Sequence, residues 1–173
     1  MTMRERALPR SLVAGLLRWL KRKDVGYADV RYEHVLHENL VAEQGRVSSI
    51  SLSESAGVGI RVLVNGSWGF AGTPHLTAAS LQAAAGQAIE LAKHVSRINR
   101  RPRPLTPVEP LTARHTSRFT IDPFEVPLAK KLDYLLWANS TLLGPDAVKR
   151  AAPHLDFFKR RKLFRSTEGA DLE

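Results

Sequence analysis

The sequence predicts an α+β fold in which a mostly antiparallel or mixed sheet packs against two long helices. The clearest signal is a hairpin: apolar residues alternate along residues 58–64, and Asn65-Gly66 then supplies the positive φ angles of a two-residue turn. Residues 77–98 and residues 125–143 instead repeat apolar side chains at helical spacing. Short links between the expected strands favour antiparallel pairing.

The amino-terminal segment predicts one short amphipathic helix over residues 11–23. Ser11 is the expected N-cap, and apolar side chains recur at helical spacing behind it. The last turn is basic, which suits the negative end of the helix dipole, and Gly26 ends the helix. The basic residues at 18–23 are therefore explained by helix structure alone.

A meander of about five strands is expected between this helix and the next one. Residues 27–33 alternate as a half-exposed strand, and a second short strand runs to a turn at Gln44-Gly45. Residues 47–52 return, and a link at residues 54–56 leads into the hairpin.

Helix 77–98 carries a broad stripe of leucine and alanine, whose small side chains allow close packing on a sheet. Residues 99–123 are rich in proline and arginine and lack periodicity, which predicts an extended connector. The second long helix is expected to end at Gly144-Pro145.

A final strand over residues 156–166 runs into a turn at residues 167–169. The return strand is then expected to be missing, so that the chain looks truncated. The expected organisation is residues 1–98 for the first helix, meander, hairpin and alanine-rich helix, residues 99–123 for the connector, and residues 124–173 for the second helix and the start of a strand.

Composition limits the class of protein. The 173 residues include no cysteine, which excludes disulfides and thiol chemistry within this chain and fits a cytoplasmic location. No apolar run reaches the length of a membrane span, so we expect no membrane partner. The net charge of +9 permits attraction to nucleic acid, anionic lipid or acidic polypeptides without choosing among them.

The histidines do not predict a metal site. A zinc-protease helix carries two histidines on one face with a glutamate beside the first, and the only His-Glu pair is His37-Glu38. Val41 and Ala42 occupy the positions where the second histidine would stand. A structural or solvent-exposed role is expected for each of His34, His37, His75, His94, His115 and His154.

Two groups of residues are candidate contacts. Trp68 and Phe70 follow the hairpin turn and are expected mainly in the core between sheet and helix; the alternative is an exposed aromatic platform that, with Arg61, contacts a peptide or a partner. The best candidate contact for nucleic acid is the basic cluster beside three phenylalanines. Its residues are Lys159, Arg160, Arg161 and Lys162. The alternative explanation of this cluster is an edge strand protected by charge.

Several motifs resemble, in order, the amino-terminal domain of the TldD/PmbA family, the bacterial and archaeal metallopeptidases once called modulators of DNA gyrase. Besides the hairpin and the alanine-rich helix, these motifs are Tyr27-Ala-Asp-Val-Arg-Tyr-Glu, Ile121-Asp-Pro followed by Lys130-Lys131-Leu132, and Ser166-Thr-Glu-Gly. Family members are longer, and their zinc-binding His-Glu-x-x-x-His helix lies carboxyl-terminal to the part that this chain resembles.

The resemblance implies that the complete protein is a zinc-dependent peptidase acting on peptides or unfolded proteins. It also implies a homodimer or a heterodimer with a TldD/PmbA-type subunit, in which this domain helps enclose the substrate. We expect no catalytic or metal-binding residue in this chain. The alternatives are a stand-alone domain that regulates a full-length homologue, and a basic nucleic-acid-binding module.

Overall fold

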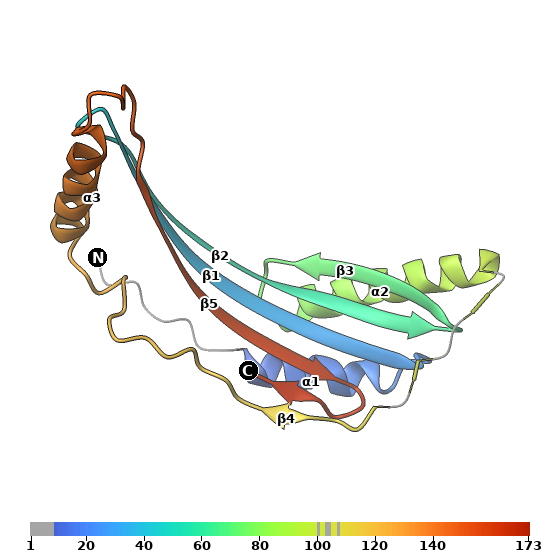
Figure 1. Cartoon of the computed structure of the whole chain (residues 1–173). Coiled ribbons are helices and arrows are strands. Elements are labelled where there is room, and N and C mark those ends of the chain that lie inside the picture. The colour runs from blue at the N-terminus through green and yellow to red at the C-terminus, as the bar shows by residue number, and fades with distance from the viewer. Residues whose placement is uncertain (1–8, 100, 103–104, 107) are drawn as a thin grey trace. The chain divides into compact units, whose positions relative to one another are not determined.

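The computed structural model describes residues 9–99, 101–102, 105–106 and 108–173 (Figure 1). It is an α+β fold with a six-stranded mixed sheet in the order β3-β2-β1-β5-β6-β4, which confirms the predicted class. The strands are β1 (Tyr27–Glu43), β2 (Arg46–Val64), β3 (Ser67–Thr73), β4 (Thr112–Ala113), β5 (His154–Ser166) and β6 (Asp171–Leu172). The helices are α1 (Arg10–Leu20), α2 (Ala78–Ile98) and α3 (Leu128–Leu143).

The expected meander of five short strands is wrong, because β1 and β2 are each one long strand. β2 continues through the link expected at residues 54–56, which contains no residue that breaks a strand. Both expected turns are confirmed. Gln44-Gly45 has φ angles of 49° and 78°, and Asn65-Gly66 has φ angles of 48° and 71°, as a type I′ turn requires.

The described residues divide into two compact units, each made of segments that are distant in the sequence. Unit 1 lies within Met1–His34, Ala56–His115 and Arg161–Glu173; unit 2 comprises Val35–Ser55 and Thr116–Arg160. β1, β2 and β5 each contribute one end to each unit. The predicted boundaries of the connector, at residues 99 and 123, stay a prediction.

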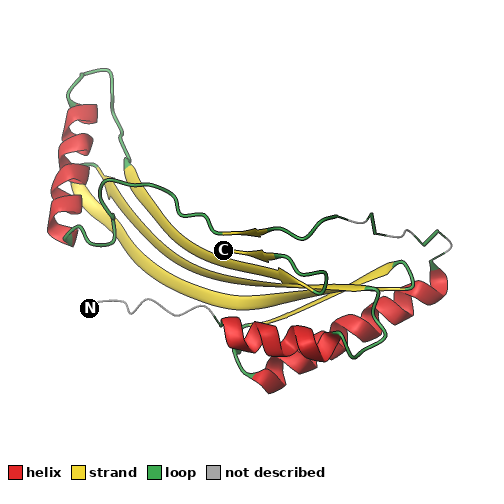
Figure 2. Cartoon of the chain, turned by 90° about the horizontal axis from the view of Figure 1, so that it is seen from below, coloured by secondary structure: helices red, strands yellow, loops and turns green. Residues whose placement is uncertain are grey.

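In unit 1, α1 and α2 lie side by side on one face of the strands (Figure 2). Buried side chains of both helices form one core with alternate residues of β1 and β2, including Val30 and Ile60. Thr77 caps α2 by accepting a hydrogen bond from the Ser80 backbone N–H at 3.2 Å. Ser11 is not the N-cap of α1; Pro9 holds that position, without a side-chain cap.

α2 packs closely on β3 because glycine stands at the contact. A Cβ atom built on Gly69 would lie 1.9 Å from the carbonyl oxygen of Ala88 and 2.7 Å from the backbone nitrogen of Ala92. Ser67 and Gly69 are buried, whereas Trp68 and Phe70 are exposed. Since side chains alternate along a strand, the two aromatic residues point away from α2.

In unit 2, the smaller core consists of Leu40, Ala42 and Leu135, with three partly buried leucines around it. α3 begins at Leu128, three residues later than expected, because the residues before its Pro127 cap form turns. The buried Lys131 of α3 forms an ion pair with Glu38 of β1, whose side chain is 11% exposed. The described residues form three helices, so the predicted arrangement of two long helices against one sheet stays a prediction.

The carboxyl-terminal strand has a return partner, contrary to expectation. β6 follows the turn after β5 and pairs with it antiparallel, so that Phe164 lies opposite Leu172 and Arg165 opposite Asp171. β4 then pairs with β6 in parallel. Arg10 and Arg165 both form ion pairs with Asp171, which fixes β6 within unit 1. Among the described residues, no helix combines the length and apolar character needed to cross a membrane.

Candidate functional site

The sheet of unit 1 presents an arginine and two aromatic side chains on the face opposite α1 and α2. In the β2–β3 pairing, Arg61 lies opposite Phe70 and Leu63 opposite Trp68, so all four side chains share one face. Trp68 is 38% exposed and Phe70 is 62% exposed. The expectation that Trp68 and Phe70 fill the core is therefore wrong, because Gly69 rather than either aromatic residue faces α2.

Arg61 is held in place by a buried carboxylate. Its Nε and Nη2 atoms donate hydrogen bonds to Oδ2 of Asp29 at 2.8 Å and 2.7 Å. Arg31 Nε donates to the other oxygen, Oδ1, at 3.2 Å. The Asp29 side chain is fully buried, while the Arg31 and Arg61 side chains are 58% and 40% exposed. Two guanidinium groups therefore share one carboxylate, and both remain accessible to solvent.

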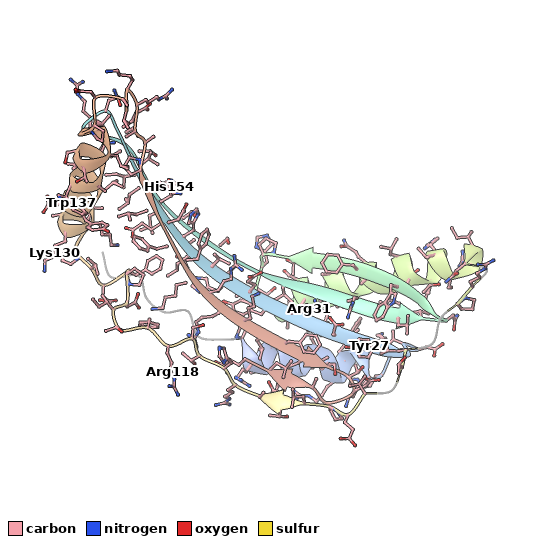
Figure 3. The ribbon with its side chains drawn as sticks, viewed as in Figure 1. Tyr27, Arg31, Arg118, Lys130, Trp137 and His154 are labelled. Carbon is pink, nitrogen blue, oxygen red and sulfur yellow. The ribbon has the colours of Figure 1, made fainter. Side chains whose placement is uncertain are left out.

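Aromatic rings extend this arrangement. The Arg61 guanidinium lies 4.4 Å from the centroid of the Trp68 ring, within the range of a cation–π contact. Tyr27 meets Trp68 edge to face, with ring centroids 5.8 Å apart, and Arg31 lies 5.3 Å from the Phe164 ring. Figure 3 shows Tyr27 and Arg31 along β1. Burial, together with the nearby Asp29 carboxylate, raises the pKa of Tyr27, so its phenol is neutral at neutral pH.

We name this surface the arginine–aromatic face. Its members are Tyr27, Asp29, Arg31, Arg61, Trp68, Phe70 and Phe164. The sequence pointed to Arg61, Trp68 and Phe70 but missed the others, since Asp29 and Arg31 fit an ordinary solvated strand face. The sequence did contain one signal for this face. Asp29 stands two positions after Tyr27 and two positions before Arg31, so the three side chains lie on the same side of a strand.

The basic cluster at residues 159–162 lies on β5, and its charges have acidic or aromatic neighbours. Lys159 Nζ lies 2.7 Å from Asp122 Oδ2, and this ion pair lowers the pKa of the Asp122 carboxyl. Arg161 and Lys162 each lie 3.7 Å from a glutamate oxygen, and Arg160 lies 5.7 Å from the Phe158 ring centroid. A nucleic-acid contact at this cluster stays a prediction.

One group of histidines and an aspartate comes together in unit 2. His37 Nε2 lies 2.6 Å from Asp156 Oδ1, and the imidazole stacks on the Phe158 ring with centroids 4.1 Å apart. His154 Nε2 lies 3.8 Å from Asp156 Oδ2. Hydrogen bonds from His37 and then Asn39 lower the pKa of the Asp156 carboxyl. Across the part of the chain that the structure describes, no group of three or more His, Cys, Asp or Glu side chains could hold a metal ion.

A family model described as PmbA/TldA metallopeptidase domain 1 matches residues 28–92, which include all of β1 but its first residue, β2, β3 and most of α2. Over residues 28–92, the chain matches the first domain of the TldD/PmbA family. The matched segment includes Asp29, Arg61, Trp68 and Phe70. No curated protein matches the chain.

Solved structures share the fold of this chain. A protein described as a putative modulator of a DNA gyrase, from Thermotoga maritima, superposes with a TM-score of 0.74 at 16% identity, over 94% of this chain and 36% of its own length. TldE from Thermococcus kodakarensis gives a TM-score of 0.70 at 17% identity, over 92% of this chain and 36% of its own length. A protein described as a putative modulator of DNA gyrase, from Bacteroides thetaiotaomicron, gives a TM-score of 0.71 at 12% identity, over 94% of this chain and 37% of its own length. The chain thus spans little more than a third of the length of these structures.

Proposed function

We propose that this chain is the amino-terminal, substrate-contacting and dimerising domain of a TldD/PmbA-type zinc metallopeptidase of the cytoplasm, and that its arginine–aromatic face binds extended polypeptide. The family match supports the first part of the proposal. The observation that carries the second part is the exposed pair Trp68 and Phe70 beside Arg61, which is anchored by Asp29.

The chemistry of this face suits a polypeptide. Tryptophan, tyrosine and arginine are enriched where proteins contact one another, because they bury large areas and donate hydrogen bonds from few side chains. Asp29 orients the Arg61 guanidinium and leaves part of it exposed, so little side-chain entropy is lost when a ligand binds. Arg31 and Arg61 carry two positive charges against the one negative charge of Asp29. The remaining positive charge favours acidic residues or backbone carbonyls in the bound segment.

The zinc of such a peptidase is assigned to no residue of this chain. When bound in the complete protein, zinc would supply a polarised water for peptide hydrolysis. The role proposed for the described residues is to hold the substrate, with a second TldD/PmbA-type subunit as the partner in a homodimer or heterodimer.

A titration of the chain with a disordered, acidic polypeptide, followed by calorimetry, tests this proposal. We expect saturable binding, and an affinity at least about tenfold lower for Trp68→Ala, which removes an aromatic anchor. Trp137→Ala is the matched control, since Trp137 on α3 is also exposed, at 60% (Figure 3). Its affinity should stay within about twofold of the wild type. Absence of binding, or equal losses in both folded variants, would refute the proposal.

A further inference from the structure

Unit 1 contains an open pocket that adjoins the arginine–aromatic face. Its volume is about 260 Å³, and Tyr27 and Phe164 of that face form part of its lining. The rest of the lining comes from the segment before β4, which includes Leu111, and from the turn between β5 and β6. We name it the Tyr27 pocket, after the first residue of β1, which Figure 3 labels. A ligand that lies on the arginine–aromatic face can therefore reach this pocket.

Hydrogen bonds hold the walls of the Tyr27 pocket in place. Thr167, in the turn after β5, bonds twice to Ala28 of β1. Its N–H donates to the Ala28 carbonyl oxygen at 2.8 Å, and its Oγ1 atom accepts from the Ala28 N–H at 2.9 Å. The N–H of Asp171 donates to the Leu111 carbonyl oxygen at 3.0 Å, which joins the other wall to β6. Because the fold itself fixes both walls, little conformational entropy is lost when a ligand enters.

The lining of the Tyr27 pocket combines apolar side chains with two carboxylates. Leu111, Phe164 and Ala170 supply apolar surface, and Glu109 and Glu168 supply the charge. Both glutamates are exposed. Among the described residues, neither glutamate side chain forms an ion pair or a hydrogen bond, and none of the residues that line the pocket is basic. The pocket thus carries two negative charges on a chain whose net charge is +9.

We propose that the Tyr27 pocket binds a basic side chain, lysine or arginine, of the polypeptide that lies on the arginine–aromatic face. The inference rests on the proposed function, since it names which polypeptides that face accepts. A basic side chain matches both parts of the lining, because its aliphatic stem packs on apolar surface while its charged end stays in solvent beside carboxylates. An acidic side chain would be repelled by Glu109 and Glu168, and a leucine side chain would gain nothing from their charge.

The distance between the pocket and Arg61 predicts the spacing of charges in the bound segment. Tyr27 lines the pocket, and Asp29, which anchors Arg61, stands two residues later on β1. Two residues of a strand span about 7 Å, and side chains two positions apart point to the same side. An extended polypeptide can thus place an acidic side chain at Arg61 and a basic side chain in the pocket, two residues apart. We expect a preference for segments in which acidic and basic residues alternate at this spacing.

Titration of the full chain with synthetic peptides, followed by calorimetry, tests the inference. The probe is a short disordered peptide of serine and threonine around Glu-Ser-Lys-Ser-Glu, which offers the required spacing in both chain directions. Acetylation of its lysine keeps the stem and removes the charge. We expect the acetylated peptide to bind about fivefold more weakly, since an exposed ion pair changes affinity by up to about that factor. A peptide with alanine in place of the lysine should bind more weakly still, because the stem is lost as well.

Variants of the chain show whether the two glutamates recognise the lysine. Glu109→Gln combined with Glu168→Gln should bind the lysine peptide about fivefold more weakly, and should bind the acetylated peptide within about twofold of the wild-type affinity. Glu125→Gln is the matched control and should change neither affinity, because Glu125 is also exposed but does not line the pocket. Trp68→Ala should weaken the binding of both peptides by a similar factor, because Trp68 belongs to the arginine–aromatic face and not to the lining of the pocket.

The outcomes separate this inference from the proposed function. Equal affinities for the lysine and acetylated peptides, both reduced in Trp68→Ala, overturn the inference and leave peptide binding by the arginine–aromatic face intact. Tighter binding of a peptide with leucine in place of the lysine also overturns it, since the pocket would then be an apolar site. A preference for lysine that persists in the double glutamine variant overturns it as well, because other residues would then recognise the charge. A chain that binds none of these peptides refutes the proposed peptide binding together with the inference.

Discussion

Replacing Gly69 with alanine tests the packing that orients the arginine–aromatic face. The new Cβ atom would lie 1.9 Å from the carbonyl oxygen of Ala88, about 1.5 Å inside the 3.4 Å at which ordinary contact begins. Both close atoms belong to the backbone of α2, so no side-chain rotation relieves the overlap. We expect the free energy of unfolding to fall by about 3 kcal/mol, at the upper end of the cost of overpacking.

Gly86 provides a matched control on the same helix. A Cβ atom at Gly86 meets nothing within 4 Å, so Gly86→Ala should raise stability by up to about 1 kcal/mol through helix propensity. In a chain of this size, these changes correspond to a melting temperature about 6–12 °C lower for Gly69→Ala and about 2–4 °C higher for Gly86→Ala. Circular dichroism during heating measures both values. A Gly69→Ala variant that melts within about 2 °C of the wild type would show that α2 does not approach β3 as described.

Two further predictions concern buried and paired charges. Glu38→Gln should lower the free energy of unfolding, measured in urea, by about 3–5 kcal/mol, because it leaves the buried Lys131 without its charged partner. The double variant Glu38→Leu with Lys131→Met removes both charges and should lower the free energy of unfolding far less. Equal losses in the two variants would contradict this reasoning. Arginine side chains lower the pKa of the Asp171 and Glu173 carboxyls, chiefly Arg165 for the first and Arg10 for the second. A lowered folded-state pKa adds stability that is present above the unfolded pKa and is lost as pH falls through the folded value, so stability should drop below about pH 4. The difference in melting temperature between the wild type and Asp171→Asn should shrink over the same range, and a difference that stays constant down to pH 2 would refute this assignment.

Local signals in the sequence were enough to predict much of the fold. The turns at Gln44-Gly45 and Asn65-Gly66 need residues that tolerate positive φ, and both are where the sequence placed them. The helices near residues 10–20 and 78–98 follow from periodicity and, for the second, from the Thr77 cap. The lengths of β1 and β2 could not be predicted, because a strand whose polar and apolar residues alternate irregularly gives no clear continuation signal.

The arginine–aromatic face shows where sequence reasoning reaches its limit. Whether Trp68 points inward depends on which neighbour faces α2, and that depends on long-range packing against Ala88. Asp29 and Arg61 lie 32 positions apart in the sequence, on two different strands. Neither segment alone contains a pattern that predicts their contact. The pairing of β6 with β5 was missed for a different reason: two residues are too few to show a period.

The most direct test of the proposed function is cleavage of a disordered polypeptide by a full-length TldD/PmbA-type subunit with zinc, measured with and without this chain. We predict that the wild-type chain binds the subunit and changes the cleavage rate, that Trp68→Ala binds the subunit without changing the rate, and that a chelator abolishes cleavage. An unchanged rate, with no complex detected by light scattering, would contradict the assignment of this chain as a substrate-contacting domain of such a peptidase.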